Sequence, residues 1–371
     1  MLLTTKAKIY WPCVMVGGLI VAGGGCGEPQ DVSVGDAGVG DALIDDQPIS
    51  SGVASPVSCE PVVGPLQAAV IIVNSEADAV TCSADEVSEL MFGESDSVHA
   101  FYRESSFGQF DVQGSVVAEV TLTTRVDEFC CRGMCDNMAF SRWFAEADAA
   151  AEASTAGLDL STYDVRVYVT PPLSLCGGTN SNGVSRPGRA LSSRCTATKV
   201  FAHEIGHTMG MQHSSVPGFE VGTASDYGDA SDVMGIGFNQ LNAPHRTQLG
   251  WLPKHQVIAV SEAGTYRLAM LETEQSAPQV LVIDRKDDPS QALLLSFRRP
   301  VGFDESLPAE FVDRTSIHQF VSKCSQDRPR SLLLGTIGDG EVFSDSAAGV
   351  SITQVTHSDS SATVTVEFFN E

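Results

Sequence analysis

Residues 203–213 read HEIGHTMGMQH, and this stretch sets the strictest condition on how the chain can fold. Residues four apart share one face of a helix, so His203 and His207 can direct two imidazoles at a single metal ion. Glu204 is offset by one position, which places its carboxylate beside the open side of that ion. The chain must therefore form a helix at this point if the pattern is used.

His213 is the candidate third ligand, because a catalytic zinc takes three protein ligands and keeps its fourth position for water. Gly210 can adopt a positive φ, which would end the helix and turn the chain so that His213 returns to the ion. The alternative is an ordinary helix with surface histidines, since a bare HExxH occurs often by chance. The extended spacing HExxHxxGxxH is much rarer, and it favours the metal site.

Three motifs carry a resemblance to a known family: HEIGHTMGMQHSS, DYGDASDVMG and FNQLNAPHRTQLGWL. Together they resemble the gametolysin-like metallopeptidases, a metzincin family of zinc proteases. The resemblance implies that His203, His207 and His213 hold zinc, that Glu204 is the general base, and that Met234 lies in a turn beneath the histidines. It begins near the strand at Leu66 and extends, less specifically, into the C-terminal part of the chain.

The implied activity is hydrolysis of peptide bonds in protein or peptide substrates. Zinc activates a water molecule, and Glu204 takes its proton and later delivers it to the departing amine. Some metzincins carry a tyrosine two residues after the methionine, but this chain has Ile236 there, so the oxyanion partner stays open and Tyr227 is one candidate. The alternatives are a catalytically idle surface binding or adhesion protein on a metzincin scaffold, which would not need Glu204, and a zinc amidase acting on cell-wall peptides.

Carboxylates and a further histidine lie near the motif in sequence. Asp226, Asp229 and Asp232 recur at intervals of three, and such residues can bind calcium, cap turns or orient a metal-binding histidine. We interpret His245 as structural, with Asn242 capping a short helix and Leu249 and Trp251 packing near the site. The tail histidine His318 has the same structural interpretation.

The first 26 residues pair two lysines with a short apolar run, as in a secretory signal, and lead through small residues into Cys26. This resembles the lipobox of bacterial lipoproteins and predicts lipidation of Cys26, with ordinary cleavage nearby as the alternative. Residues 27–64 are acidic and polar and predict a disordered tether. We therefore expect an exported protein, anchored at the cell surface or the outer membrane if lipidated and secreted otherwise.

Export implies an oxidising compartment, and eight cysteines remain after Cys13 and Cys26 are set aside. They can all pair, but the sequence does not give the connectivity. Cys59 could pair with Cys82 or act as a latency switch on the metal, and Cys176 and Cys195 could close the loop at 177–193. We expect disulfides rather than a second metal site in CCRGMC (130–135).

The formal charge of −25 argues against binding nucleic acid or an anionic membrane surface. We accordingly expect no nucleic-acid partner, membrane contact only through a lipid anchor, and a monomer. Apolar runs and capping signals predict a strand at 66–75, helices at 83–92, 97–110 and 138–154, and strands at 111–122 and 163–172.

These elements predict an α+β fold: a metzincin-type catalytic domain, with a mixed twisted sheet and the zinc-site helix, followed by a smaller all-β domain. We place the signal at 1–26, the tether at 27–64, the catalytic domain at 65–258 and the β-rich domain at 259–371. The last domain rests on short alternating runs separated by Gly, Pro, Asp and Ser, and a β-sandwich would suit them.

Overall fold

The structure is a computed structural model that describes residues 61–125, 130–131, 134–135, 137–172, 183–321 and 329–369, with the main chain alone between 130 and 139. The predicted signal, Cys26, nearly all of the tether, and Cys59, Cys176 and Cys324 lie outside the described residues. The described residues belong to one compact unit and combine α-helices with several sheets. The α-helices described are α1 (Ala84–Phe92), α2 (Val98–Ser105), α3 (Asn137–Ser154), α4 (Thr198–Thr208) and α5 (Ala243–Gln248).

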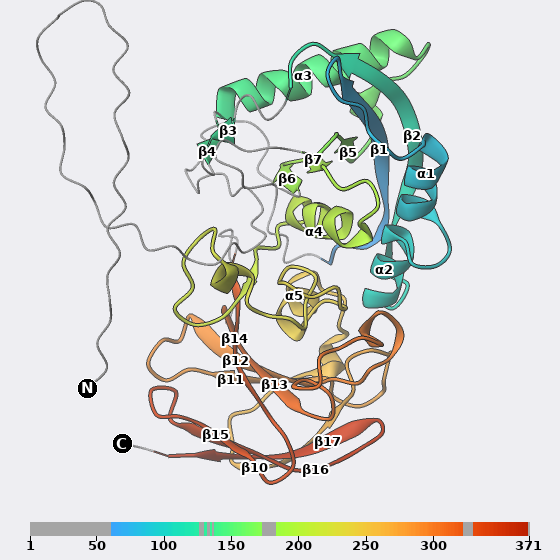
Figure 1. The fold of residues 1–371 in the computed structure, drawn as a ribbon. Helices are drawn as coiled ribbons and strands as arrows, with labels where there is room; N and C mark the ends of the chain where they lie inside the picture. The colour runs from blue at the N-terminus through green and yellow to red at the C-terminus, as the bar shows by residue number, and fades with distance from the viewer. Residues whose placement is uncertain are drawn as a thin grey trace, which may run out of the picture. The chain divides into compact units, whose positions relative to one another are not determined.

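A five-stranded sheet with the order β2-β1-β5-β7-β6 forms the centre of the N-terminal part (Figure 1). All neighbours in it run parallel except β6, which is antiparallel to β7. Its strands are β1 (Gly64–Ser75), β2 (Phe110–Leu122), β5 (Val165–Val169), β6 (Gly183–Arg186) and β7 (Arg189–Ser192). The short strands β3 (Cys130–Cys131) and β4 (Met134–Cys135) pair with each other.

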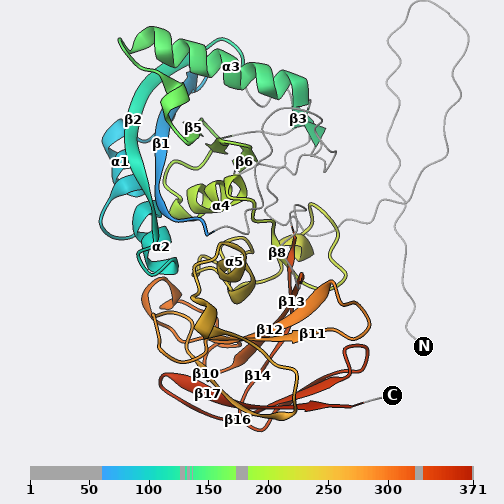
Figure 2. The same cartoon turned by 180° about the vertical axis from the view of Figure 1, so that it is seen from behind.

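The central strand β1 is buried on both faces, as its continuous apolar sequence predicts. Val70 and Ile72 face a core shared with α1, α2 and α4. Ala69 and Ile71 face a second core, which is filled largely by aromatic residues of α3. Figures 1 and 2 show α3 and α4 on opposite sides of this sheet.

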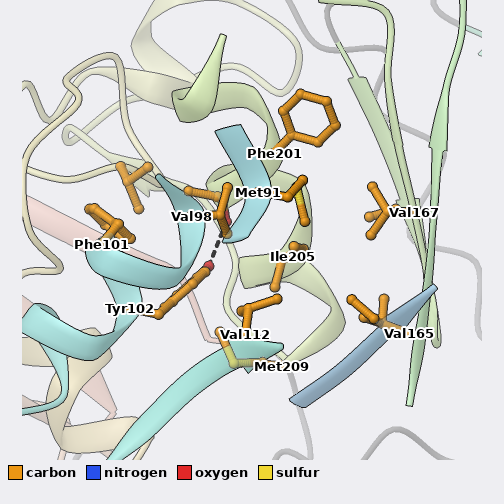
Figure 3. Packing of buried hydrophobic residues seen from close by; sticks show 14 of the residues in the cluster. Met91, Val98, Phe101, Tyr102, Val112, Val165, Val167, Phe201, Ile205 and Met209 are labelled. Atoms are coloured by element: carbon orange, nitrogen blue, oxygen red, sulfur yellow. Dashed lines mark hydrogen bonds between the residues drawn. The ribbon is translucent and has the colours of Figure 1, made fainter. Parts of the chain in front are cut away.

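Local sequence signals located the starts of α1 and α2. Ser83 caps α1 in a reciprocal capping box with Glu86, as predicted. Ser97 caps α2, which ends at Ser105 and is shorter than the predicted 97–110. The Tyr102 hydroxyl donates a hydrogen bond to the carbonyl of Ala202 over 2.5 Å, and this bond ties α2 to the start of the HEIGH motif (Figure 3).

The C-terminal β region, defined here as residues 257–369, has no α-helix among its described residues and supplies every strand of two sheets except β8. One sheet has the order β10-β17-β16-β15 and the other β8-β14-β13-β12-β11-β9, and they share an apolar core. The strands are β8 (Ser214–Ser215), β9 (Val257–Ala259), β10 (Gly264–Ala269), β11 (Val280–Asp284), β12 (Gln291–Phe297), β13 (Thr315–Val321), β14 (Ser331–Ile337), β15 (Val342–Asp345), β16 (Val350–Ser358) and β17 (Ser361–Phe368).

The six-stranded sheet takes its edge strand β8 from the segment directly after the HEIGH motif. The predicted boundary between residues 258 and 259 also falls inside β9. The division of the chain into two domains at that point stays a prediction. None of the helices in the described ranges is long and apolar enough to cross a membrane.

Cys82, just before α1, forms a disulfide with Cys195, just before α4. The suggested pairs Cys59–Cys82 and Cys176–Cys195 are therefore both wrong. The interpretation of 177–193 as one loop also needs correction, because residues 183–192 form the β6–β7 hairpin. Its strands have only four residues each, and Gly188 supplies the positive φ of the turn, so the alternating signal was too short to recognise.

Candidate metal centre

Helix α4 carries His203, Glu204 and His207, and all three side chains are buried. The two imidazole rings lie side by side, with centroids 4.7 Å apart. This is the arrangement expected for residues four apart on one helix face. Burial, and next the charge of His213, lower the pKa of His203 well below its ordinary value. A neutral imidazole is the form that binds a metal ion.

Gly210 ends this helix in the way the sequence predicts. Its φ is 89°, a conformation that residues with a side chain rarely adopt. The amide of Met211 then donates back to the carbonyl of Gly206 over 3.2 Å. The chain turns, and His213 comes to lie with its ring centroid 4.9 Å from that of His207 and 5.4 Å from that of His203.

The donor atoms of the three histidines lie within 4.8 Å of one another. Each ring also directs its Nδ1 at a protein oxygen: His203 at the Val233 carbonyl (2.8 Å), His207 at the Met211 carbonyl (2.8 Å) and His213 at a carboxylate oxygen of Asp226 (3.1 Å). Such partners fix the ring and leave Nε2 as the ligand atom, which is how proteins hold zinc-binding histidines. The set of three imidazoles therefore fits a zinc ion.

The Glu204 side chain, on the same helix as His203 and His207, lies against Gly183, the first residue of β6. A Cβ built on Gly183 would be 2.5 Å from Oε1 of Glu204 and 2.7 Å from its Cγ. Only a glycine therefore leaves room for the carboxylate in its present position. No local pattern predicts this contact, because Gly183 lies 21 residues before Glu204 in the sequence.

Met234 is buried and packs against α4. Its Sδ would be 2.5 Å from a Cβ built on Gly206, so helix and methionine are in close contact at this glycine. The turn is tight, because a Cβ on Gly235 would lie 1.9 Å from the carbonyl oxygen of Asp229. Met234 thus packs against α4 at Gly206, and its role as a floor under the histidines stays a prediction.

The aspartates at positions 226, 229 and 232 each contact a different histidine. The partners are His213 for Asp226, His318 for Asp229 (2.9 Å) and His245 for Asp232 (3.0 Å). All six side chains are buried. Among the described residues, the three zinc-motif histidines are the only group of three or more ligand residues placed to hold a metal ion, so calcium at the aspartates has no support.

The profile of the gametolysin peptidase M11 family matches residues 67–347, which is more than half of the chain. The protein belongs to the gametolysin peptidase M11 family. The resemblance inferred from the three motifs is thus confirmed, and the protein is a metallopeptidase by family. A search of curated proteins found no match.

The family assignment does not identify the residue that stabilises the oxyanion, but the structure shows which tyrosine lies beside the histidines. Tyr227 is buried, and its ring centroid is 4.1 Å from that of His213 and 5.9 Å from that of His203. Ile236, at the position where some metzincins have a tyrosine, is 59% exposed. Tyr227 is therefore the tyrosine that this M11 peptidase places beside its histidines.

The short helix α5 and its flanking residues (242–251) have the structural roles that the sequence predicts. Asn242 caps α5 by accepting from the amide of His245, and Leu249 and Trp251 pack in the core that α4 shares. His245 is buried against Asp232 and does not belong to the group of three ligand histidines. Its structural interpretation agrees with this placement.

Two residues of the site escaped the sequence analysis: Gly183, beside Glu204, and Arg330, which donates to Asp226. Arg330 lies 117 residues after His213. No local pattern relates it to the motif.

Proposed function

We propose that the protein is an exported zinc endopeptidase. The observation that carries this proposal is the group of three buried histidines with oriented rings, in a chain that belongs to an M11 peptidase family. His203, His207 and His213 would hold the ion. When bound, zinc supplies a Lewis acid that activates water and polarises the scissile carbonyl.

Glu204 is the proposed general base and acid. Its carboxylate accepts the proton of the attacking water and delivers it to the amine that departs when the peptide bond breaks. Its burial beside Gly183 excludes bulk water from one side of the carboxylate and fixes its position. Met234 packs against α4, the helix that carries two of the proposed ligands, His203 and His207, and the proposed base Glu204.

We also propose that residues 65–258 have the metzincin architecture. A mostly parallel sheet with one antiparallel edge strand, β6, packs against the zinc helix, and this arrangement supports the assignment. Export and lipidation of Cys26 remain proposals that rest on the N-terminal sequence. The Cys82–Cys195 disulfide supports an oxidising compartment.

The experiment compares wild type with Glu204→Gln. Zinc content and casein digestion are measured with and without a zinc chelator. We expect wild type to contain zinc and digest casein, and Glu204→Gln to keep zinc while losing about 100-fold or more of its turnover. Glu89→Gln, on the exposed side of α1, is the control and should change neither quantity.

Retained digestion by Glu204→Gln would refute the role of the base, and absence of zinc from wild type would refute the metal centre. Zinc binding with no hydrolysis of any substrate would favour the idle binding scaffold. Cell-wall peptides are tested in parallel, because exclusive cleavage of these would favour the amidase alternative.

A further inference from the structure

The third ligand is attached to a different layer of the molecule from the other two. His203 and His207 lie on α4, which packs on the five-stranded sheet. His213 is followed at once by β8, which pairs in parallel with β14: Ser214 is in register with Ser331 and Ser215 with Leu332. His213 therefore depends on the C-terminal β region for its position.

Arg330, the residue just before β14, reaches from that region into the metal centre. Its Nη1 donates a hydrogen bond to Oδ1 of Asp226 and lies 3.3 Å from Nδ1 of His213. Its guanidinium lies over the ring of Phe219, 4.8 Å from the centroid. The side chain is only 15% exposed, so contacts on both sides determine its position.

Asp226 is the link between Arg330 and the ligand. One carboxylate oxygen, Oδ1, accepts from Arg330, and the other, Oδ2, is 3.1 Å from Nδ1 of His213. Oδ2 also accepts from the amide of Gly222 over 2.9 Å. The Asp226 carboxylate is fully buried, so its orientation is set by these partners and by the hydroxyl of Ser215.

We infer that Arg330 is a positioning residue of the metal centre. It fixes the plane of the Asp226 carboxylate, and the carboxylate in turn fixes the His213 ring with Nε2 toward the ion. The C-terminal β region is thereby part of the zinc site. This inference rests on the proposed function, because it requires zinc at the three histidines.

Whether zinc binding weakens or tightens when Arg330 is replaced distinguishes a positioning role from a purely electrostatic one. A guanidinium close to a zinc ion repels it, so a purely electrostatic role predicts that removing Arg330 tightens zinc binding. A positioning role predicts the opposite, because the carboxylate loses a partner and the ring loses its fixed orientation. Loss of such outer partners typically weakens metal binding by about 10- to 100-fold.

The test measures zinc affinity of the full chain by competition with a chromophoric chelator. We expect Arg330→Gln to bind zinc about 10- to 100-fold more weakly than wild type. The visible spectrum of the cobalt(II) form should also change, because it reports the ligand geometry. Arg314→Gln is the matched control: Arg314 likewise precedes a strand of the same sheet, but it pairs with Glu341 and should leave zinc binding unchanged. Unchanged or tighter zinc binding in Arg330→Gln overturns the inference.

A double-mutant cycle that combines Arg330→Gln with Asp226→Asn tests whether Arg330 acts through Asp226. If Arg330 acts through Asp226, the double variant should bind zinc no more than about twofold more weakly than Asp226→Asn alone. Fully additive losses would overturn the inference. If Arg330→Gln does not fold, Arg330→Met replaces it, because methionine keeps apolar packing on Phe219 and removes the hydrogen bond.

The two failures are distinguishable. A wild-type protein that binds no zinc removes the proposed function together with this inference. A wild type that binds zinc through the three histidines, with Arg330→Gln equal to it, removes this inference alone.

Discussion

Replacing Gly183 with alanine should displace Glu204, the proposed general base, and leave zinc binding by the histidines unchanged. Alanine places a methyl carbon 2.5 Å from Oε1 of Glu204, whereas ordinary contact begins at 3.4 Å. The carboxylate must therefore move by about 0.9 Å or more. Gly183 does not have a positive φ, so alanine suits its backbone and the effect is steric.

The expected loss follows from this displacement. A misplacement of about 1 Å in a catalytic constellation can reduce the rate by about 100-fold. This corresponds to about 2.7 kcal/mol of transition-state stabilisation. We therefore expect kcat of Gly183→Ala to fall by about 10- to 100-fold. Zinc content should remain that of wild type, because the three atoms nearest to the added methyl all belong to Glu204.

The assay is steady-state hydrolysis of a peptide substrate, with zinc content measured on the same samples. Gly264→Ala is the control, because its Cβ would meet nothing closer than 3.5 Å and its φ is not positive. A variant Gly183→Ala with full zinc and a kcat within about twofold of wild type would refute the reasoning. Loss of zinc in this variant would show that the cause lies elsewhere.

Two further predictions concern the folded state. Gly235→Ala should lower the free energy of unfolding by about 3 kcal/mol or more, because its methyl would lie 1.9 Å from the carbonyl oxygen of Asp229. Gly206→Ala should change the free energy of unfolding by about 1 kcal/mol or less, because the ends of the neighbouring methionine side chains can move aside. Equal denaturant midpoints for the two variants would contradict this prediction. Burial of Asp229 raises the pKa of its carboxyl group. The hydrogen bond and charge of His318, together with hydrogen bonds from Ser231 and Ser214, lower this pKa by more than burial raises it, so the pKa is below the ordinary 3.8. A lowered carboxyl pKa contributes stability above about pH 4 that is lost as pH falls, so Asp229→Asn should destabilise by about 3 kcal/mol at pH 7 and by clearly less at pH 3 in urea unfolding. The same difference at both pH values would contradict the pKa argument.

Features that depend on neighbours in sequence could be predicted. The capping box at Ser83 and Glu86, the two-faced burial of β1 and the positive φ of Gly210 each follow from residues within a turn or a strand. The three ligand histidines are of this kind, because helix periodicity and one glycine are enough to bring them together. The family assignment rested on the same local motifs.

Features that depend on long-range packing could not be predicted. Cys82 and Cys195 are 113 residues apart, and nothing near either one selects the other over a closer cysteine. The contact of Gly183 with Glu204 likewise arises only when the edge strand β6 is laid against α4. The aspartates were recognised as candidates to orient a ligand, but which histidine each one contacts depends on three separate elements.

The pairing of β8 with β14 means that the metal centre can be completed only late in synthesis of the chain. Ser214 emerges directly after the last ligand, but its partner Ser331 follows 117 residues later. The helix with His203 and His207 can form early, whereas His213 acquires its sheet neighbour only when nearly the whole chain is available. Hydrolytic competence should therefore arise as a late event of maturation, after most of the chain has been made.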